Sequence, residues 1–192
     1  MEKNIYQIQL TLKNFRPKIW RRLLVPSDVL LSDLHKIIQT TMGWTNSHLH
    51  QFEKNREFYE PPAPEDMMLD SYGVDYTGLK LNDFLLKPKE KFTYEYDFGD
   101  GWEHEITLEK ILPSDTSTTL PVCIAGAMNC PPEDCGGVWG YSELLEIMKD
   151  PGHEEYEMYK EWLPEDFDPE YFDMDDINKA LQMKDYGCIE FL

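Results

Sequence analysis

Three histidines in this sequence lie among aromatic and acidic residues, where an imidazole could bind a ligand or a metal ion. His48 and His50 occur in SHLHQFEK, and His104 occurs in YEYDFGDGWEHEI. Residues two apart on a strand project from the same face, so the side chains of His48 and His50 are expected about 7 Å apart and able to bind one ligand together. If the two segments are neighbouring strands, all three imidazoles converge at one end of a sheet.

The segment around His104 predicts a β-hairpin. Residues 92–98 and 102–108 alternate between apolar and polar side chains, which is typical of strands with one buried face. The Gly-Asp-Gly sequence between them predicts a three-residue turn. In that register Phe98 lies opposite Trp102 and Tyr96 lies opposite His104, which places His104 on the buried aromatic face.

The same register separates the carboxylates of the hairpin into two groups. Asp97 falls on the opposite face with Glu103 and Glu105, where we expect a solvated acidic surface. Asp100 lies in the turn and can reach either face. Asp100 is therefore the carboxylate of the hairpin that could contribute to a site beside Trp102.

A second candidate segment is the loop CIAGAMNCPPEDCGG. Two prolines precede Glu133 and Asp134, and Gly136 and Gly137 follow them. Prolines stiffen the backbone and glycines permit conformations closed to other residues, so the two carboxylates are held in a defined geometry. The loop either positions these carboxylates in a site or caps the helix that begins near Tyr141.

A divalent metal ion is one cofactor that these residues could hold. His48, His50 and His104 would provide nitrogen ligands, and Asp100, Glu133 or Asp134 would serve as an oxygen ligand or general base. The thiols of Cys123, Cys130 and Cys135 are weaker candidates. They have six and four residues between them, unlike the Cys-x2-Cys spacing of structural zinc sites, and each also fits a small buried residue.

The relation between His104 and the Pro-Pro-Glu-Asp loop decides whether these residues form one site. We expect Glu133 or Asp134 within hydrogen-bond reach of His104, directly or through one water, with His50 in the same cluster. The alternative is that His104 is a core histidine bonded to a tyrosine or to the backbone, with the loop turned outward as a helix cap.

Charge is distributed unevenly along the chain, whose formal net charge is −19. Residues 1–56 hold nine Lys or Arg and four Asp or Glu, whereas residues 133–192 hold four and eighteen. An acidic chain repels a phosphate backbone, so nucleic-acid binding would require the local patch of Arg16, Lys18, Arg21 and Arg22. The acidic C-terminal part instead favours a cationic protein or peptide as partner.

The chain is expected to be cytoplasmic and not associated with a membrane. No segment approaches the roughly 18 consecutive apolar residues of a membrane span. The start MEKNIYQIQL lacks the charged-then-apolar pattern of a secretory signal. The four cysteines are therefore expected as reduced thiols.

These segments must be positioned by a fold that we predict to be a single α+β domain over residues 1–192, sheet-rich over 1–112 and with loops and helices over 113–192. Strands of an antiparallel sheet are expected at 4–13, 18–25, 48–59, 91–98 and 102–111. A helix at 31–43, capped by Ser32 and ended by Gly43, and the C-terminal helices cover one face. Residues 60–90 and 123–141 are expected to contain little regular structure.

Five motifs resemble those of the plasmid pRiA4b ORF-3-like family in order and spacing: PKIWRR, HLHQF, YDFGDGWEHEI, CPPEDCGGVWGY and DFDPEYFDMDDIN. The resemblance covers nearly the whole chain and implies an α+β domain encoded in prokaryotic genomes and mobile elements, with no established activity. Matching the motifs nominates His48, His50, Asp97, Asp100, Trp102, His104, Glu133, Asp134, Gly136, Gly137 and Tyr141. The family often has another residue at Cys135, so the resemblance does not imply a metal-ligating thiol there.

Two classes of function fit these residues. The first is a non-enzymatic binding or adaptor domain with a pocket lined by His50, Trp102, His104 and the Glu133–Asp134 loop, because aromatic and acidic groups meet without a nucleophile-base pair. The alternative is a metal-dependent hydrolase, such as a phosphodiesterase, in which a divalent ion activates water.

Overall fold

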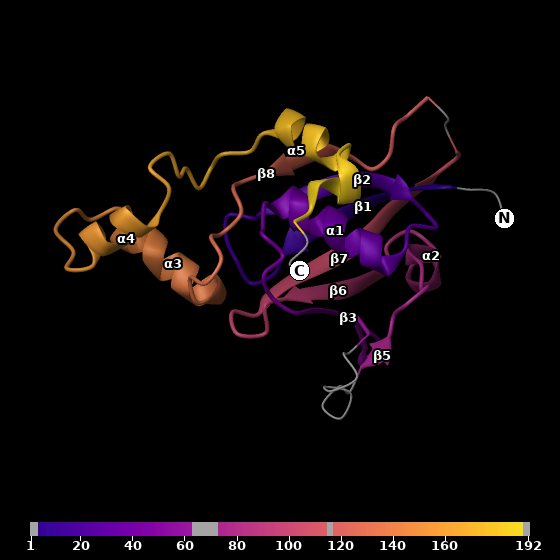
Figure 1. Cartoon of the computed structure of the whole chain (residues 1–192), viewed down its shortest axis with the longest axis horizontal. Helices are drawn as coiled ribbons and strands as arrows, with labels where there is room; N and C mark the ends of the chain where they lie inside the picture. The colour runs from indigo at the N-terminus through magenta and orange to yellow at the C-terminus, as the bar shows by residue number, and fades with distance from the viewer. Residues whose placement is uncertain (1–3, 63–72, 115–116, 190–192) are drawn as a thin grey trace.

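The computed structural model describes residues 4–62, 73–114 and 117–189, in which eight strands form one sheet (Figure 1). The strand order is β5-β4-β3-β6-β7-β1-β2-β8, and every neighbouring pair is antiparallel except β4 and β5. The strands are β1 Ile5–Leu12, β2 Trp20–Pro26, β3 His50–Lys54, β4 Glu57–Glu60, β5 Val74–Asp75, β6 Lys91–Tyr96, β7 Trp102–Leu112 and β8 Val122–Ala127. The predicted α+β fold with a mainly antiparallel sheet is confirmed.

The helices lie mostly in the second half of the chain, as predicted. They are α1 Leu31–Met42, α2 Leu81–Phe84, α3 Gly137–Ile147, α4 Tyr156–Trp162 and α5 Met174–Leu181, followed by the 3-10 helix η1 Lys184–Gly187. In Figure 1, α5 lies beside β8, whereas α3 and α4 extend away from the sheet. None of the helices in the described residues has the length and apolar character needed to cross a membrane.

Helix α1 packs on the sheet through an apolar face and ends as predicted. Gly43 has a left-handed φ of 92°, and its N–H donates to the Gln39 carbonyl, which stops the helix. The predicted cap by Ser32 is wrong. The residue before the helix is the extended Leu30, which makes an isolated bridge to Lys80, so strand-like pairing fixes the start of the helix without a capping side chain.

Two other predicted elements differ from the structure. The strand expected at 48–59 is a hairpin, because Asn55 and Arg56 take left-handed φ values of 56° and 69° and turn the chain between β3 and β4. Residues 122–127, expected to be irregular, form β8 on the edge of the sheet next to β2. Gly126 lets Phe172 pack closely on this strand, since a Cβ there would lie 2.5 Å from the ring of Phe172. In the 60–90 connection, residues 63–72 lie outside the described residues.

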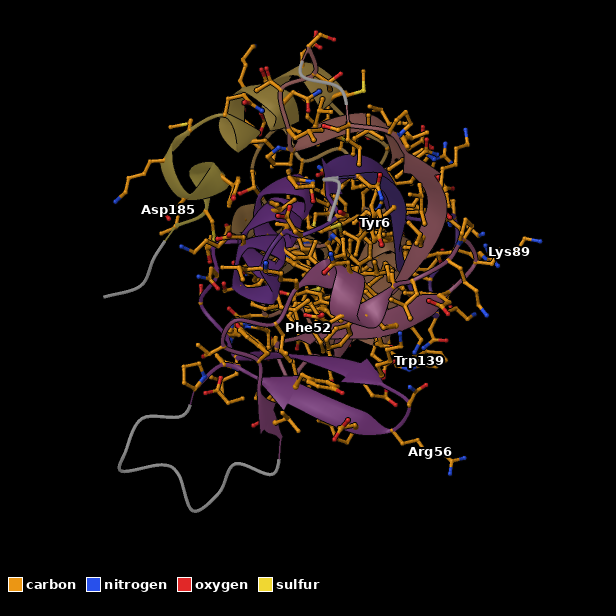
Figure 2. The ribbon with its side chains drawn as sticks, turned by 90° about the vertical axis from the view of Figure 1, so that its right-hand side faces the viewer. Tyr6, Phe52, Arg56, Lys89, Trp139 and Asp185 are labelled. Atoms are coloured by element: carbon orange, nitrogen blue, oxygen red, sulfur yellow. The ribbon has the colours of Figure 1, made fainter. Side chains whose placement is uncertain are left out.

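One continuous core joins the sheet to α1. Phe52 from β3 belongs to this interior, whereas Arg56 and Lys89 project at the periphery (Figure 2). Arg21, predicted as part of a surface basic patch, is only 2% exposed. Its guanidinium donates to the carbonyls of Thr41, Trp20 and Ala127, and it therefore connects α1 to the two neighbouring strands β2 and β8.

The rest of the predicted basic patch is also smaller than expected. Arg22 makes two hydrogen bonds to the carboxylate of Glu109, at 2.6 and 2.7 Å, which neutralises its charge locally. Arg16 and Lys18 are exposed. The surface that remains for a nucleic-acid backbone is therefore reduced to these two side chains.

Candidate metal and loop site

The turn of the β6–β7 hairpin is two residues longer than predicted. Tyr96 pairs with Trp102 and Tyr94 pairs with His104, so residues 97–101 form the loop. Asp97 ends the strand because it takes a left-handed φ of 57° and its N–H donates to the Leu49 carbonyl at 2.8 Å. The predicted pairings of Phe98 with Trp102 and of Tyr96 with His104 are therefore wrong. Asp97, predicted on a solvated face, is 7% exposed.

His104 lies in the core. It is fully buried, and its Nδ1 donates to the Trp102 carbonyl at 3.0 Å. Burial lowers the pKa of His104 to about 3, because the charged imidazolium would lose its hydration. The side-chain contact of His104 is thus to the backbone, as in the alternative weighed from the sequence, and the expected direct bond to Glu133 or Asp134 is not made.

Glu133 instead joins two other loops. Its Oε1 accepts from the Tyr96 hydroxyl at 2.5 Å, and its Oε2 accepts from the N–H of Thr45 at 3.2 Å and from the Thr45 hydroxyl at 2.5 Å. Trp44 adds a bond from Nε1 to the Pro131 carbonyl at 3.2 Å. The Pro-Pro-Glu-Asp loop is therefore fixed against residues 44–47 and the end of β6.

Asp134 is brought by this attachment next to His48 and Asp97. The Nε2 atom of His48 lies 3.3 Å from Oδ1 of Asp134 and 3.7 Å from Oδ2 of Asp97. One potential ligand atom from each of the three residues lies within 4.8 Å of the others. Within the described ranges, these three residues are the group of His, Cys, Asp or Glu side chains that lie close enough together to hold a metal ion.

The atoms of this His48-Asp97-Asp134 cluster are free to bind a ligand. Oδ1 of Asp97 accepts from the N–H groups of Gly99 and Asp100, at 3.0 and 3.4 Å, which leaves Oδ2 directed at His48. The Nε2 atom of His48 is shielded from solvent and has no hydrogen-bond partner among the described residues. The Asp134 side chain is 74% exposed, so the cluster opens to solvent on one side.

Two of the three donor distances in the cluster, both from His48, are compatible with a single divalent ion. Two nitrogen or oxygen donors that each lie about 2.1 Å from one ion are at most about 4.2 Å apart. The two distances from His48 meet this limit. Three protein ligands also leave coordination positions for water, the arrangement found in catalytic sites.

His50 belongs to a different, buried group. Its ring stacks on His35 with centroids 3.5 Å apart, and its Nε2 pairs with the Tyr76 hydroxyl at 2.8 Å. His35 donates from Nε2 to the Asn46 amide oxygen, so its Nδ1 accepts from the Tyr94 hydroxyl, both at 2.8 Å. Burial lowers the pKa of His35 to about 4, and the stack is a pair of neutral imidazoles.

The three predicted imidazoles therefore separate. The strand neighbourhood that the sequence left open is present, because β3 pairs with β6 and His50 lies opposite Tyr96. His48, however, precedes β3 and turns towards Asp97, whereas His50 and His104 lie on either side of Tyr94 in the core.

Asp100 and the two glycines after Cys135 fasten the hairpin loop to the start of α3. Oδ2 of Asp100 accepts from the Gly136 N–H at 3.2 Å. A Cβ on Gly137 would lie 2.2 Å from the Asp100 carbonyl oxygen, so the two backbones are in direct contact. Tyr141, one turn further, is 1% exposed and packs against Phe15. The nominated residues Asp100, Gly136, Gly137 and Tyr141 thus position the site.

None of the cysteines joins a ligand group in the part of the chain that the structure describes. Cys123 and Cys130 are buried, and burial raises the pKa of each thiol. Burial also raises the pKa of Cys135 to about 12. All three are therefore neutral thiols near neutral pH, with Cys123 and Cys130 in the core and Cys135 partly buried.

Sequence reasoning missed Trp44 and Thr45, which hold the Pro-Pro-Glu-Asp loop, and His35, which stacks on His50 in the buried group. Trp44 and Thr45 follow the Gly43 helix stop and resemble an ordinary connection. A Trp and a Thr after a helix end carry no pattern of their own. The position of His35 on the buried face of α1, one residue after Leu34 and two before Ile37, was the available signal.

One family description, one relative and one solved structure match most of this chain. The description "Plasmid pRiA4b ORF-3-like protein" matches residues 4–176. The uncharacterized protein y4hQ of Sinorhizobium fredii (strain NBRC 101917 / NGR234) is 37% identical over 184 residues, covering 94% of this chain and 92% of the relative. The crystal structure of a protein of unknown function from Methanosarcina mazei Go1 is similar with a TM-score of 0.80 and 42% identity, covering 92% of this chain and 98% of that one.

Proposed function

We propose that this chain, which belongs to the plasmid pRiA4b ORF-3-like family, is a metal-dependent hydrolase whose divalent ion is held by His48, Asp97 and Asp134. The observation that carries the proposal is the shielded His48 Nε2 atom, which has no hydrogen-bond partner among the described residues and lies within 3.7 Å of two carboxylates from two other segments. A cytoplasmic location and an association with mobile elements stay predictions.

The types of ligand atom in the cluster determine which metal ions and reactions it would support. One imidazole and two carboxylates are ligands for Mn²⁺, Fe²⁺ or Zn²⁺. An ion held by three protein groups acidifies a bound water and polarises a phosphoryl or carbonyl oxygen. Because Glu133 and Asp100 use their carboxylates to fix loops, Asp134 is the exposed carboxylate that could also accept a proton from that water.

Removal of one ligand tests metal binding directly. Changes in outer partners of metal ligands typically cost about 10- to 100-fold in affinity, so the loss of a ligand in His48→Ala should cost at least about 100-fold. Asp97→Asn and Asp134→Asn should weaken binding while they keep the fold, because Asn tolerates the left-handed φ of both positions, 57° and 60°. Titration calorimetry with Mn²⁺ and Zn²⁺ on protein without a histidine tag measures this.

His153→Ala is the matched control, since His153 is exposed and lies outside the cluster. It should bind either ion as the unchanged chain does. Equal affinity of His48→Ala and His153→Ala would refute the metal site and leave His48 as a side chain that only contacts two carboxylates.

The reaction is tested separately, with bis(para-nitrophenyl) phosphate as a phosphodiester probe and para-nitrophenyl acetate as an ester probe. Metal-dependent release of nitrophenolate that disappears in His48→Ala supports a hydrolase. Tight metal binding without turnover of either probe would refute these reactions and favour the second class, a binding domain. A groove lined by Asp134, Cys135, Met158, Tyr159 and Trp162 favours that second class independently.

A further inference from the structure

Helix α4 lies outside the core. None of its seven residues is buried, and its two large apolar side chains, Met158 and Trp162, are 53% and 46% exposed. Short helices in proteins are stabilised mainly by packing an apolar face. In Figure 1, α3 and α4 extend away from the sheet at the left, so α4 offers a helix face that the described residues leave largely uncovered.

A groove lies between this helix and the loop that carries Asp134. Asp134, Cys135, Met158, Tyr159 and Trp162 line a hollow of about 230 Å³. Sites for whole drug-sized ligands have volumes of about 300 to 1,000 Å³, so this groove is suited to one large side chain of a partner. Its walls are apolar on the α4 side and carry a carboxylate at Asp134.

The chain segment that contains α4 is strongly acidic. Residues 154–170 contain eight Asp or Glu and one Lys. That lysine, Lys160, lies 3.7 Å from Glu157 and is therefore already opposed by a carboxylate of its own helix. Such a surface attracts cations, and it repels phosphate backbones and acidic peptides.

We propose that the groove between Asp134 and α4 binds a cationic peptide segment, with an apolar side chain in the hollow and flanking lysines or arginines against the acidic residues around it. The negative charge of residues 154–170 favours a positively charged partner, and the apolar walls favour an apolar side chain in the hollow. The groove does not require the metal ion, and it shares only Asp134 with the cluster.

Binding is measured by fluorescence anisotropy with a fluorescein-labelled peptide in which lysines flank a central leucine. Two comparison peptides replace the leucine by glycine or the lysines by glutamates. The lysine-leucine peptide should bind, the glycine peptide should bind more weakly, and the glutamate peptide should not bind. Added salt should weaken binding, because the attraction is between exposed charges. Addition of a chelator should leave it unchanged, which separates this proposal from the metal site.

Trp162→Ala and Met158→Ala should each weaken binding of the lysine-leucine peptide, by at least about tenfold for the tryptophan. Both variants should fold, since α4 contributes no buried residue. Leu86→Ala is the control, because Leu86 is 69% exposed outside this surface. The proposal is overturned if the lysine-leucine peptide fails to bind, if the glutamate peptide binds equally, or if Trp162→Ala and Leu86→Ala bind alike.

Discussion

Lowering the pH from about 7 to about 4 is expected to remove on the order of 6 kcal/mol from the free energy of unfolding through His35 and His104. His50, whose pKa burial also lowers, adds to this loss in the same direction. His35 and His104 stay neutral in the folded chain, because burial lowers their pKa values to about 4 and about 3. In the unfolded chain each has an ordinary pKa of about 6.5. Natural domains are stable by about 5 to 15 kcal/mol, so this loss is sufficient to unfold many of them.

The direction follows from proton uptake. Between about pH 6.5 and about pH 4 the unfolded chain binds a proton at each histidine that the folded chain does not bind, so acid favours unfolding. Each site contributes about 1.4 kcal/mol per pH unit in this range. The stability that the neutral histidines contribute is fully present above about pH 6.5 and is lost as the pH falls below this value. For His35 the loss ends near its folded pKa of about 4.

Urea unfolding at a series of pH values measures the slope. His104→Asn keeps a donor for the Trp102 carbonyl and removes the titration, so its stability should fall by about 1.4 kcal/mol less per pH unit. His35→Gln should act in the same way, and the exposed His153→Asn should leave the slope unchanged. The slope is the readout, since the core substitutions also lower stability at every pH. Slopes equal to that of the unchanged chain would contradict the prediction.

The paired carboxylate of Glu109 titrates in a lower window than these histidines. The hydrogen bond from Arg22 lowers the pKa of Glu109 below its usual value, so the stability that this carboxylate provides is lost only as the pH falls through acidic values below about 4.5. The interval between about pH 6.5 and about pH 4.5 therefore lies above the window in which Glu109 titrates.

Local patterns predicted most of the fold. The alternation in residues 5–12 and 102–108 identified β1 and β7, and Gly43 identified the end of α1. Such patterns depend on which side chains face the core. The β8 strand was missed because VCIAGA has no alternation that a strand requires, and pairing with β2 makes it extended.

The sequence nominated the residues of the candidate site but did not predict how they are arranged in space. The motifs correctly brought the hairpin loop, the His48 segment and the Pro-Pro-Glu-Asp loop to consideration together. The pairing of residues across the loop depends on one left-handed residue, Asp97, and a shift of the turn by one pair changes which residue faces His104. The attachment of Glu133 to Tyr96 and Thr45 depends on long-range contacts that spacing does not encode.

Gly137→Ala is expected to destabilise the chain by roughly 3 kcal/mol, from left-handed strain together with a clash in a packed contact. Gly137 has φ of 67°, and an added Cβ would lie 2.2 Å from the carbonyl oxygen of Asp100. The neighbouring Gly136 has φ of 85°, but its nearest contact would be 3.5 Å, at the Cα of Gly140. Gly136→Ala should therefore show only the backbone strain, about 1 to 2 kcal/mol.

The same pair of variants tests whether the loop contact positions the metal ligands. Asp100 lies in the loop that begins with Asp97, and Gly137 follows the loop that carries Asp134. A methyl group at Gly137 must push the two loops apart, which lengthens the distance between the Asp97 and Asp134 carboxylates. Gly137→Ala should therefore weaken Mn²⁺ binding more than Gly136→Ala does, measured by calorimetry at a temperature where both variants are folded. Equal affinities would mean that the Asp100–Gly137 contact stabilises the fold without setting the spacing of the ligands.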